Sequence, residues 1–255
     1  MRIKTTIDVY SVGLCRRAYR FLAQHGVVKT AFLCLKYALV CAQRHLLRRS
    51  GSQGLHQSIN ADFDRRFNVD TGQGPGELLN LATVSTPNWR HGIKYEPVNE
   101  DIFRQLLDSL AIRHEGFTFI DFGSGKGKAL LLAANYPFRK IIGVEYSRHL
   151  HQVATRNILS YASPARRCHK IESVCEDAAR FSIPHEACVF FFFNPFTRPI
   201  MEVVAGNILS SVTLFPRQVF LLYYHAVHAD ILRQAFQEKT KWSIGGLTHI
   251  LFQGP

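Results

Sequence analysis

The chain has 255 residues, of which 47% are apolar and 12% aromatic, a composition that excludes an intrinsically disordered or fibrous protein. Its length allows one large domain with an appendage. The net charge of +12 is concentrated at the start, because residues 1–50 hold ten Lys and Arg against one acid whereas residues 51–255 hold 21 against 18. The six cysteines include no CxxC pair, which favours reduced thiols in a cytosolic protein.

Residues 1–60 are predicted to form a basic helical arm followed by a linker. Lys29 and Lys36 interrupt its apolar middle, which disfavours both a membrane span and a signal peptide. Three roles stay open: a helical cap on the main domain, which we favour, a helix that binds anionic membrane lipid or RNA, and a mitochondrial-type presequence. We expect a cytoplasmic protein, peripheral to a membrane under the second alternative and mitochondrial under the third if the source is eukaryotic.

Residues 61–98 are predicted to be a lid or a segment near the substrate. The stretch "ADFDRRFNVDTG" favours a short helix that enters a loop, and "STPNWRHGIKYEP" favours a longer loop. Within that loop Tyr95 and Pro97 are placed either to close over a cofactor or simply to lead into the next helix. These two interpretations are equally supported by the sequence.

Residues 99–255 are predicted to form an α/β domain. Asn99 is expected to cap the first helix and Ser147 a later one. Apolar strands that alternate with helices indicate a doubly wound parallel sheet covered on both faces. The last segment, "KWSIGGLTHILF", predicts an antiparallel hairpin around two glycines, so we expect a mostly parallel seven-stranded sheet that ends in a hairpin. The predicted strands are 117–122, 140–146, 168–174, 187–193 and 218–224, and the predicted helices after the first are 128–136, 147–161, 198–212 and 229–237.

Three glycines in "FIDFGSGKGK" follow a strand and open a helix, which predicts a sharp turn that offers backbone N–H groups to a ligand. A plain tight turn is the alternative. A phosphate-binding P-loop does not fit, because Ala129 stands where Ser or Thr is needed and Phe122 where the first glycine is needed. A dinucleotide site is weakened but stays open, because Lys128 fills the third glycine position of GxGxxG.

Taken together, "FIDFGSGKGK", "IIGVEYS", "CEDAARF" and "FFFFNPF" resemble the seven-strand S-adenosylmethionine-dependent methyltransferases over roughly residues 90–255. The nearest likeness is to bacterial methyltransferases of unassigned substrate that share "FDRRF.VDT", a "Y.P" lid and "NPF". The lid and the first motif also resemble the seven-strand protein-lysine methyltransferases. The resemblance implies S-adenosylmethionine as the cofactor.

The resemblance also implies a role for each residue of the cofactor site. An acid that opens the glycine loop meets the ammonium group of the cofactor, an acid after the second strand holds the ribose hydroxyls, and an acid after the third strand receives the adenine amino group. Each acid alone would also fit a solvated surface charge, and Glu176 competes with the third. The implied cofactor-binding residues are Asp121, Gly123, Ser124, Gly125, Gly127, Glu145 and Asp177, with Tyr95 as the lid.

Asn194, Pro195 and Phe196 follow the fourth predicted strand and resemble the "NPPY/NPPF" element of amine and amide methyltransferases. The resemblance implies that Asn and Pro carbonyl oxygens orient the acceptor nitrogen while the aromatic ring packs on it. One proline is missing here, and an Asn-Pro turn that ends a strand is the plain alternative. No histidine set has metal-ligand spacing, so no metal is expected.

The sequence therefore favours transfer of a methyl group to nitrogen, with protein lysine as the first acceptor and a small amine or a nucleobase as the second. A nucleotide-binding module or an NAD(P)-dependent reductase of similar fold is the alternative.

Overall fold

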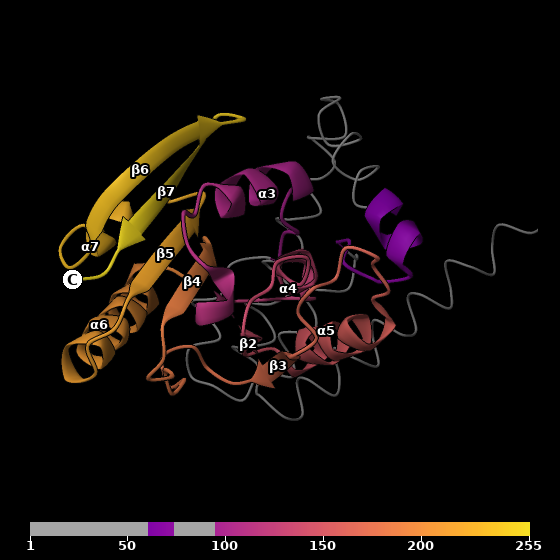
Figure 1. The fold of residues 1–255 in the computed structure, drawn as a ribbon, viewed down its shortest axis with the longest axis horizontal. Helices are drawn as coiled ribbons and strands as arrows, with labels where there is room; N and C mark the ends of the chain where they lie inside the picture. Colours follow the sequence, from indigo (N-terminus) through magenta and orange to yellow (C-terminus); the bar gives the residue numbers. More distant parts are fainter. Residues whose placement is uncertain (1–60, 74–94) are drawn as a thin grey trace, which may run out of the picture. The chain divides into compact units, whose positions relative to one another are not determined.

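A seven-stranded sheet in the order β3-β2-β1-β4-β5-β7-β6 organises the part of the chain that the computed structural model describes, residues 61–73 and 95–255 (Figure 1). Strands β1 to β5 run parallel, whereas β7 is antiparallel to both β5 and β6. The predicted α/β fold with a terminal hairpin is confirmed. The strands are β1 Thr118–Phe122, β2 Lys140–Glu145, β3 Ile171–Cys175, β4 Cys188–Phe193, β5 Val219–Tyr224, β6 Gln237–Ile244 and β7 Leu247–Gln253.

Helices connect the parallel strands, and their starts were predicted well. Asn99 caps α3, Glu100–Asp108, through its side-chain oxygen, which accepts from the N–H groups of Asp101 and Ile102. Ser147 caps α5, Arg148–Ser160, by accepting from the N–H of Leu150. Both caps are confirmed. Residues 61–67 are also helical, as predicted. From residue 100 onward the helices are α3 Glu100–Asp108, the short 3-10 helix η3 His114–Gly116, α4 Lys128–Ala133, α5 Arg148–Ser160, α6 Arg198–Leu214 and α7 Ala229–Leu232.

The central strands are apolar without alternation because both faces of the sheet are covered. In β4, Phe190 and Phe192 belong to an apolar cluster with residues of α6, whereas Phe191 belongs to a second cluster with residues of α3 and α4. Figure 1 shows α6 against one face of the sheet and α3 and α4 on the other. All three rings are fully buried, which explains why period-2 patterning is missing from this strand.

Two predicted helices were too long, and the first of them, predicted at 128–136, ends at Ala133 as α4. The predicted helix 229–237 ends at Leu232 as α7, and Gln237 is the first residue of β6. β6 begins there because Gln237 and Glu238 pair with the end of β7. Its side chains are mostly exposed, so this edge strand carries little apolar pattern from which a prediction could start.

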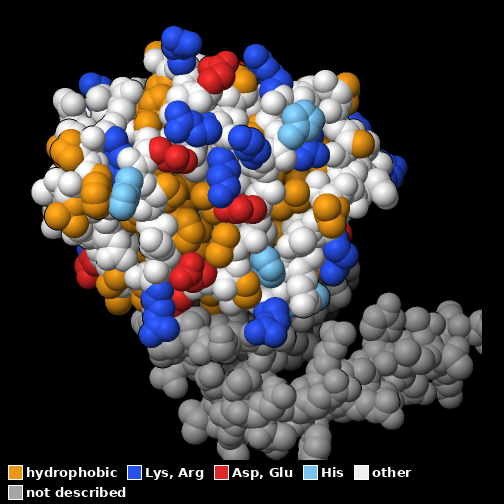
Figure 2. Space-filling view, turned by 60° about the horizontal axis from the view of Figure 1, so that its bottom comes forward, with side chains coloured by type: hydrophobic (Ala, Val, Ile, Leu, Met, Phe, Trp, Pro, Cys, Tyr) orange, Lys and Arg blue, Asp and Glu red, His pale blue; other side chains and the backbone are white. Residues whose placement is uncertain are grey.

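The described residues all belong to a single compact unit. The basic arm at 1–60 and residues 74–94 lie outside the described residues, so the predicted roles of the arm and the domain boundaries at 60 and 98 stay predictions. Figure 2 shows Lys and Arg side chains beside acidic and apolar ones on one face of the described part. Within that part, no helix has the length and apolar character that crossing a membrane requires.

Candidate cofactor site

Two carboxylates lie at the carboxyl ends of neighbouring strands. Asp121 of β1 pairs in register with Gly143 of β2, and Glu145 follows two positions later at the end of β2. Side chains two positions apart share a face of a sheet, so both carboxylates lie on the same face. From β1 the chain adds β2 and β3 on one side of the sheet and then crosses to β4 on the other side of β1. Open parallel sheets bind ligands at such a switch point, beside the carboxyl ends of the strands.

Both acids are buried, each with a relative exposure of only 3%. Burial, together with the neighbouring Glu145 carboxylate, raises the pKa of Asp121 well above its ordinary value. Burial also raises the pKa of Glu145 from 4.5 to about 7, although hydrogen bonds from backbone N–H groups oppose that shift. Two buried acids this close favour a ligand that brings positive charge or hydrogen-bond donors.

Glu145 also shapes the glycine loop. Its Oε2 accepts a hydrogen bond from the N–H of Gly125 at 2.8 Å, and its Oε1 accepts one from the N–H of Ser147 at 2.8 Å. The carboxylate therefore joins the loop after β1 to the turn that starts α5. The N–H of Tyr146 also donates to this carboxylate. A carboxylate has about four lone-pair sites, so these bonds still leave acceptor capacity for a ribose hydroxyl.

The glycine loop turns through left-handed backbone at Gly123, Gly125 and Gly127, with φ values of 78°, 55° and 83°. A Cβ atom on Gly125 would lie 2.2 Å from Cδ2 of Tyr95, and one on Gly123 would lie 2.5 Å from Cβ of Pro195. Only glycine permits both the backbone angles and these close approaches. The structure therefore brings Tyr95 and Pro195, predicted as lid and acceptor-site residues, onto the predicted glycine loop.

A buried hydroxyl in the same loop has no hydrogen-bond partner among the described residues. Ser124 is 4% exposed, and its Oγ is buried without a partner. A Cβ atom on Gly143, the register partner of Asp121, would lie 2.7 Å from this oxygen. A buried polar group without a partner costs free energy, and a ligand that supplies a donor or acceptor here would remove that cost.

Asn194 occupies an unusual position directly after β4. Its φ of 40° lies in the left-handed region, which non-glycine residues rarely adopt and which often marks functional sites. Its Oδ1 is buried and has no hydrogen-bond partner among the described residues. This carbonyl oxygen is therefore available to accept a hydrogen bond from a ligand. Phe196, two residues later, is 6% exposed and belongs to the core cluster that includes residues of α6.

His225, directly after β5, was not identified from the sequence as a site residue. Phe193 and Tyr224 are register partners, so Asn194 and His225 are the next residues of neighbouring strands, and His225 is also left-handed with a φ of 54°. Its N–H donates to Nδ1 of the buried His249 at 3.3 Å. The sequence signal was a polar residue directly after a strand of six apolar or aromatic residues.

Asp177 lies after β3, as predicted, but its Oδ1 already accepts a hydrogen bond from the N–H of Ala179 at 3.0 Å. Tyr146, between β2 and α5, was not predicted as a site residue. Burial raises its pKa, and the charges of Glu145 and Asp177 raise it further, which places the three side chains in one electrostatic environment. The adenine contact assigned to Asp177 stays a prediction.

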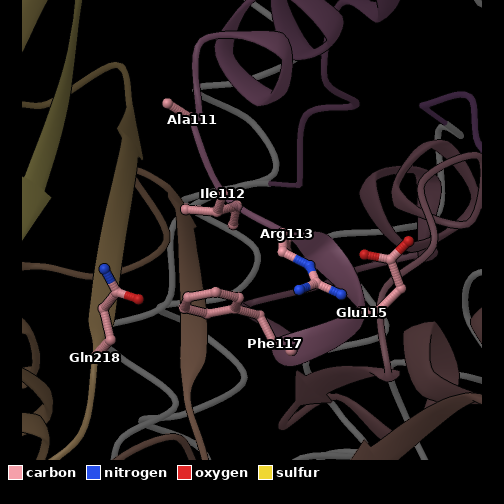
Figure 3. A pocket seen from close by; sticks show the side chains of 7 residues that line it. Ala111, Ile112, Arg113, Glu115, Phe117 and Gln218 are labelled. Carbon is pink, nitrogen blue, oxygen red and sulfur yellow. The ribbon is translucent and has the colours of Figure 1, made fainter.

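A cavity lies at the amino ends of the parallel strands, away from the carboxyl ends where Asp121 and Glu145 stand. It has a volume of about 540 Å³ and is lined by residues that precede β1 and β5, among them Arg113, Phe117 and Gln218 (Figure 3). None of the predicted site residues lines it.

Within the described ranges, no three His, Cys, Asp or Glu side chains are grouped as metal ligands. The expectation that the reaction needs no metal stays a prediction.

No family model and no curated protein matches this sequence. Similar solved structures include S-adenosylmethionine-dependent methyltransferases. A TehB-like SAM-dependent methyltransferase from Corynebacterium glutamicum is 14% identical with a TM-score of 0.44, and the match covers 60% of this chain and 87% of that one. A predicted N6-adenine-specific DNA methylase from Listeria monocytogenes is 14% identical with a TM-score of 0.48, and the match covers 64% of this chain and 53% of that one.

The 23S rRNA methyltransferase ErmE is 12% identical with a TM-score of 0.45, and the match covers 62% of this chain and 68% of that one. The match with the Listeria methylase covers only about half of that protein's length. These similarities concern the fold alone, which the strand order of this chain defines without them. They do not identify a methyl acceptor.

Proposed function

We propose that this chain is an S-adenosylmethionine-dependent methyltransferase that acts on a nitrogen acceptor. Protein lysine is the first candidate acceptor, because of the resemblance in "FDRRF.VDT" and the lid, and a small amine or a nucleobase is the second. The observation that carries the proposal is the Oδ1 of Asn194, which is buried, without a partner among the described residues, and held in left-handed backbone at the end of β4.

The donor side of the site fits this cofactor in its chemistry. S-adenosylmethionine carries a sulfonium and an ammonium group, and two buried carboxylates, Asp121 and Glu145, favour a ligand of positive charge. Glu145 keeps acceptor capacity for a ribose hydroxyl, and the Oγ of Ser124 is available in the same loop. When bound, the cofactor supplies a methyl group: the acceptor nitrogen forms the new N–C bond, the S–C bond breaks, and S-adenosylhomocysteine and a proton leave.

The chain's contribution to the reaction is to bind and orient. Asn194 Oδ1 accepts a hydrogen bond from the acceptor N–H and thereby directs the nitrogen lone pair away from itself. Pro195 contacts the glycine loop at Gly123, so the acceptor motif and the cofactor loop are held together. Orientation of this kind removes much of the entropic barrier to a two-reactant step.

Binding of the cofactor is the first test. Isothermal titration calorimetry with S-adenosylhomocysteine, and separately with NADP⁺ and NADPH, distinguishes the proposal from the reductase alternative. We expect binding of S-adenosylhomocysteine alone. Binding of the nicotinamide nucleotides alone would assign the chain to the reductase alternative, and no binding of any of the three would overturn the proposed function.

The acceptor motif is tested by Asn194→Ala. We expect kcat to fall about a hundredfold, with an unchanged Kd for S-adenosylhomocysteine, because the amide acts on the acceptor rather than on the cofactor. The matched control is Asn135→Ala, which removes an amide that accepts from Tyr161 outside the site and should leave kcat unchanged. Labelled S-adenosylmethionine with cell extract, followed by separation into protein, nucleic acid and small molecules, identifies the acceptor for this assay.

A further inference from the structure

A lysine in the glycine loop is buried, which is unusual for this residue type. Lys126 lies between Gly125 and Gly127 and is only 5% exposed. Its Nζ donates to Oδ1 of Asp70 at 2.8 Å and to the backbone carbonyl of Gly72 at 2.7 Å. A buried ammonium is costly unless it is paired, so these two contacts bind the loop firmly to residues 70–72. We call residues 61–73 the strap.

A buried amide joins the same two segments to a helix. Asn157 of α5 is 3% exposed, and its Nδ2 donates to the carbonyl oxygens of Asp70 and Lys126, each at 2.8 Å. Its Oδ1 accepts from the N–H of Asp70 at 2.8 Å. One side chain therefore holds the strap, the glycine loop and α5 in a fixed arrangement.

The strap has its own internal support. The carboxylate of Asp64 accepts hydrogen bonds from the N–H and the hydroxyl of Thr71 and from the N–H of Gly72, at 2.6 to 3.0 Å. The Nζ of Lys128 lies 4.9 Å from the ring centre of Phe63, and burial lowers the pKa of this lysine from 10.5 to about 8. Both lysines that flank Gly127 thus contact the strap.

The strap also holds the lid residue. The hydroxyl of Tyr95 donates to the carbonyl of Thr71 at 2.8 Å, and Nε2 of Gln73 donates to the carbonyl of Tyr95 at 3.1 Å. With both ends fixed in this way, the ring of Tyr95 lies against Gly125. The contacts thus run from Lys126 through the strap to Tyr95 and back to the glycine loop.

We propose that Lys126 is a positioning residue for the cofactor: by fixing the strap it holds Tyr95 and the glycine loop in the arrangement that binds the ligand. The proposal rests on the proposed function, because it assigns the loop to S-adenosylmethionine. A loop that is ordered before binding loses less conformational entropy on binding, and the affinity is correspondingly higher. The strap is therefore part of the cofactor site rather than a linker to it.

The test is a double-mutant cycle on the Kd of S-adenosylhomocysteine, measured by calorimetry well below the unfolding midpoint of each variant. Lys126→Met should raise Kd about tenfold, and Asp70→Asn about threefold because the carbonyl of Gly72 still accepts from Lys126. The double variant should bind no more weakly than Lys126→Met alone, because both changes break the same contact. Lys126→Arg should bind within about threefold of wild type, since it keeps the charge and the donors.

Lys140→Met combined with Glu172→Gln is the matched control, because it removes an ion pair of 2.6 Å between β2 and β3 that lies outside these contacts. It should leave Kd unchanged. If Lys126 only stabilised the fold, both single variants would lower the melting temperature and leave Kd unchanged, and that result would overturn the proposal. Fully additive effects of the two substitutions on the binding free energy would overturn it as well. If Lys126→Met does not fold, Asp70→Asn alone decides, since the side chain of Asp70 is 64% exposed. Absence of binding to the wild type would instead overturn the proposed function.

Discussion

Asp121 and Glu145 lie two register positions apart on neighbouring strands and are each 3% exposed. Two like charges buried side by side disfavour ionisation of both, and burial raises both pKa values. A protein selected for stability alone would replace one of them. Their arrangement is therefore costly for the ligand-free fold, and a ligand of positive charge would offset that cost.

The first prediction concerns Asp121→Asn. The amide keeps the shape of the side chain and removes a buried charge close to Glu145, so the ligand-free protein should gain about 1–2 kcal/mol of stability near pH 8. Affinity should move in the opposite direction, with a Kd for S-adenosylhomocysteine at least about tenfold higher, because the ammonium group loses its charged partner. Urea unfolding and calorimetry measure the two effects.

The control for this variant is Glu202→Gln on α6, an exposed acid 3.6 Å from Arg198. Exposed pairs of this kind contribute little, so stability should change by less than about 0.5 kcal/mol and affinity should not change. A stability loss in Asp121→Asn, with affinity kept, would show that Asp121 is a structural acid.

The second prediction concerns the pH dependence of stability. Because the pKa of Glu145 rises from 4.5 to about 7 on folding, the folded state retains a proton that the unfolded state releases between these values. The contribution of Glu145 is therefore complete below pH 4.5 and is lost as the pH rises through about 7, a change of about 3 kcal/mol. Glu145→Gln should remove this part of the slope.

Urea unfolding of both proteins from about pH 4 to about pH 8 measures this difference. Glu172→Gln on β3 is the matched control, since it is the same substitution at a half-exposed position of a neighbouring strand. Parallel curves for wild type and Glu145→Gln would show that this carboxylate titrates equally in the folded and unfolded states.

Much of the fold and part of the site were predictable from local pattern. The strands were predicted because they are apolar on both faces. Asp121 and Glu145 were named as cofactor-binding residues through the resemblance to the seven-strand methyltransferases, and the structure places them near the carboxyl ends of neighbouring strands. The contact between Lys126 and Asp70 was not predictable, because 56 residues separate them and each resembles a surface charge. β6 was placed poorly because an exposed edge strand has no apolar pattern.

The third prediction separates two costs of replacing glycine. Gly125 and Gly246 both have left-handed backbone, with φ values of 55° and 76°, but a Cβ on Gly246 would meet nothing within 4 Å. Gly246→Ala should therefore cost only the backbone strain, about 1–2 kcal/mol. Gly125→Ala should cost about 1–3 kcal/mol more, because its methyl group would overlap the ring of Tyr95.

The ring of Tyr95 cannot simply swing aside, because its hydroxyl is bound to the carbonyl of Thr71 at 2.8 Å. Removing the ring should therefore relieve the overlap: in the background of Tyr95→Ala, the additional change Gly125→Ala should cost no more than Gly246→Ala does in the wild type. The free energies of unfolding of these variants provide the test. Equal costs for the two single glycine variants would mean that Tyr95 does not lie against Gly125 in solution, and that the strap does not hold the lid on the loop.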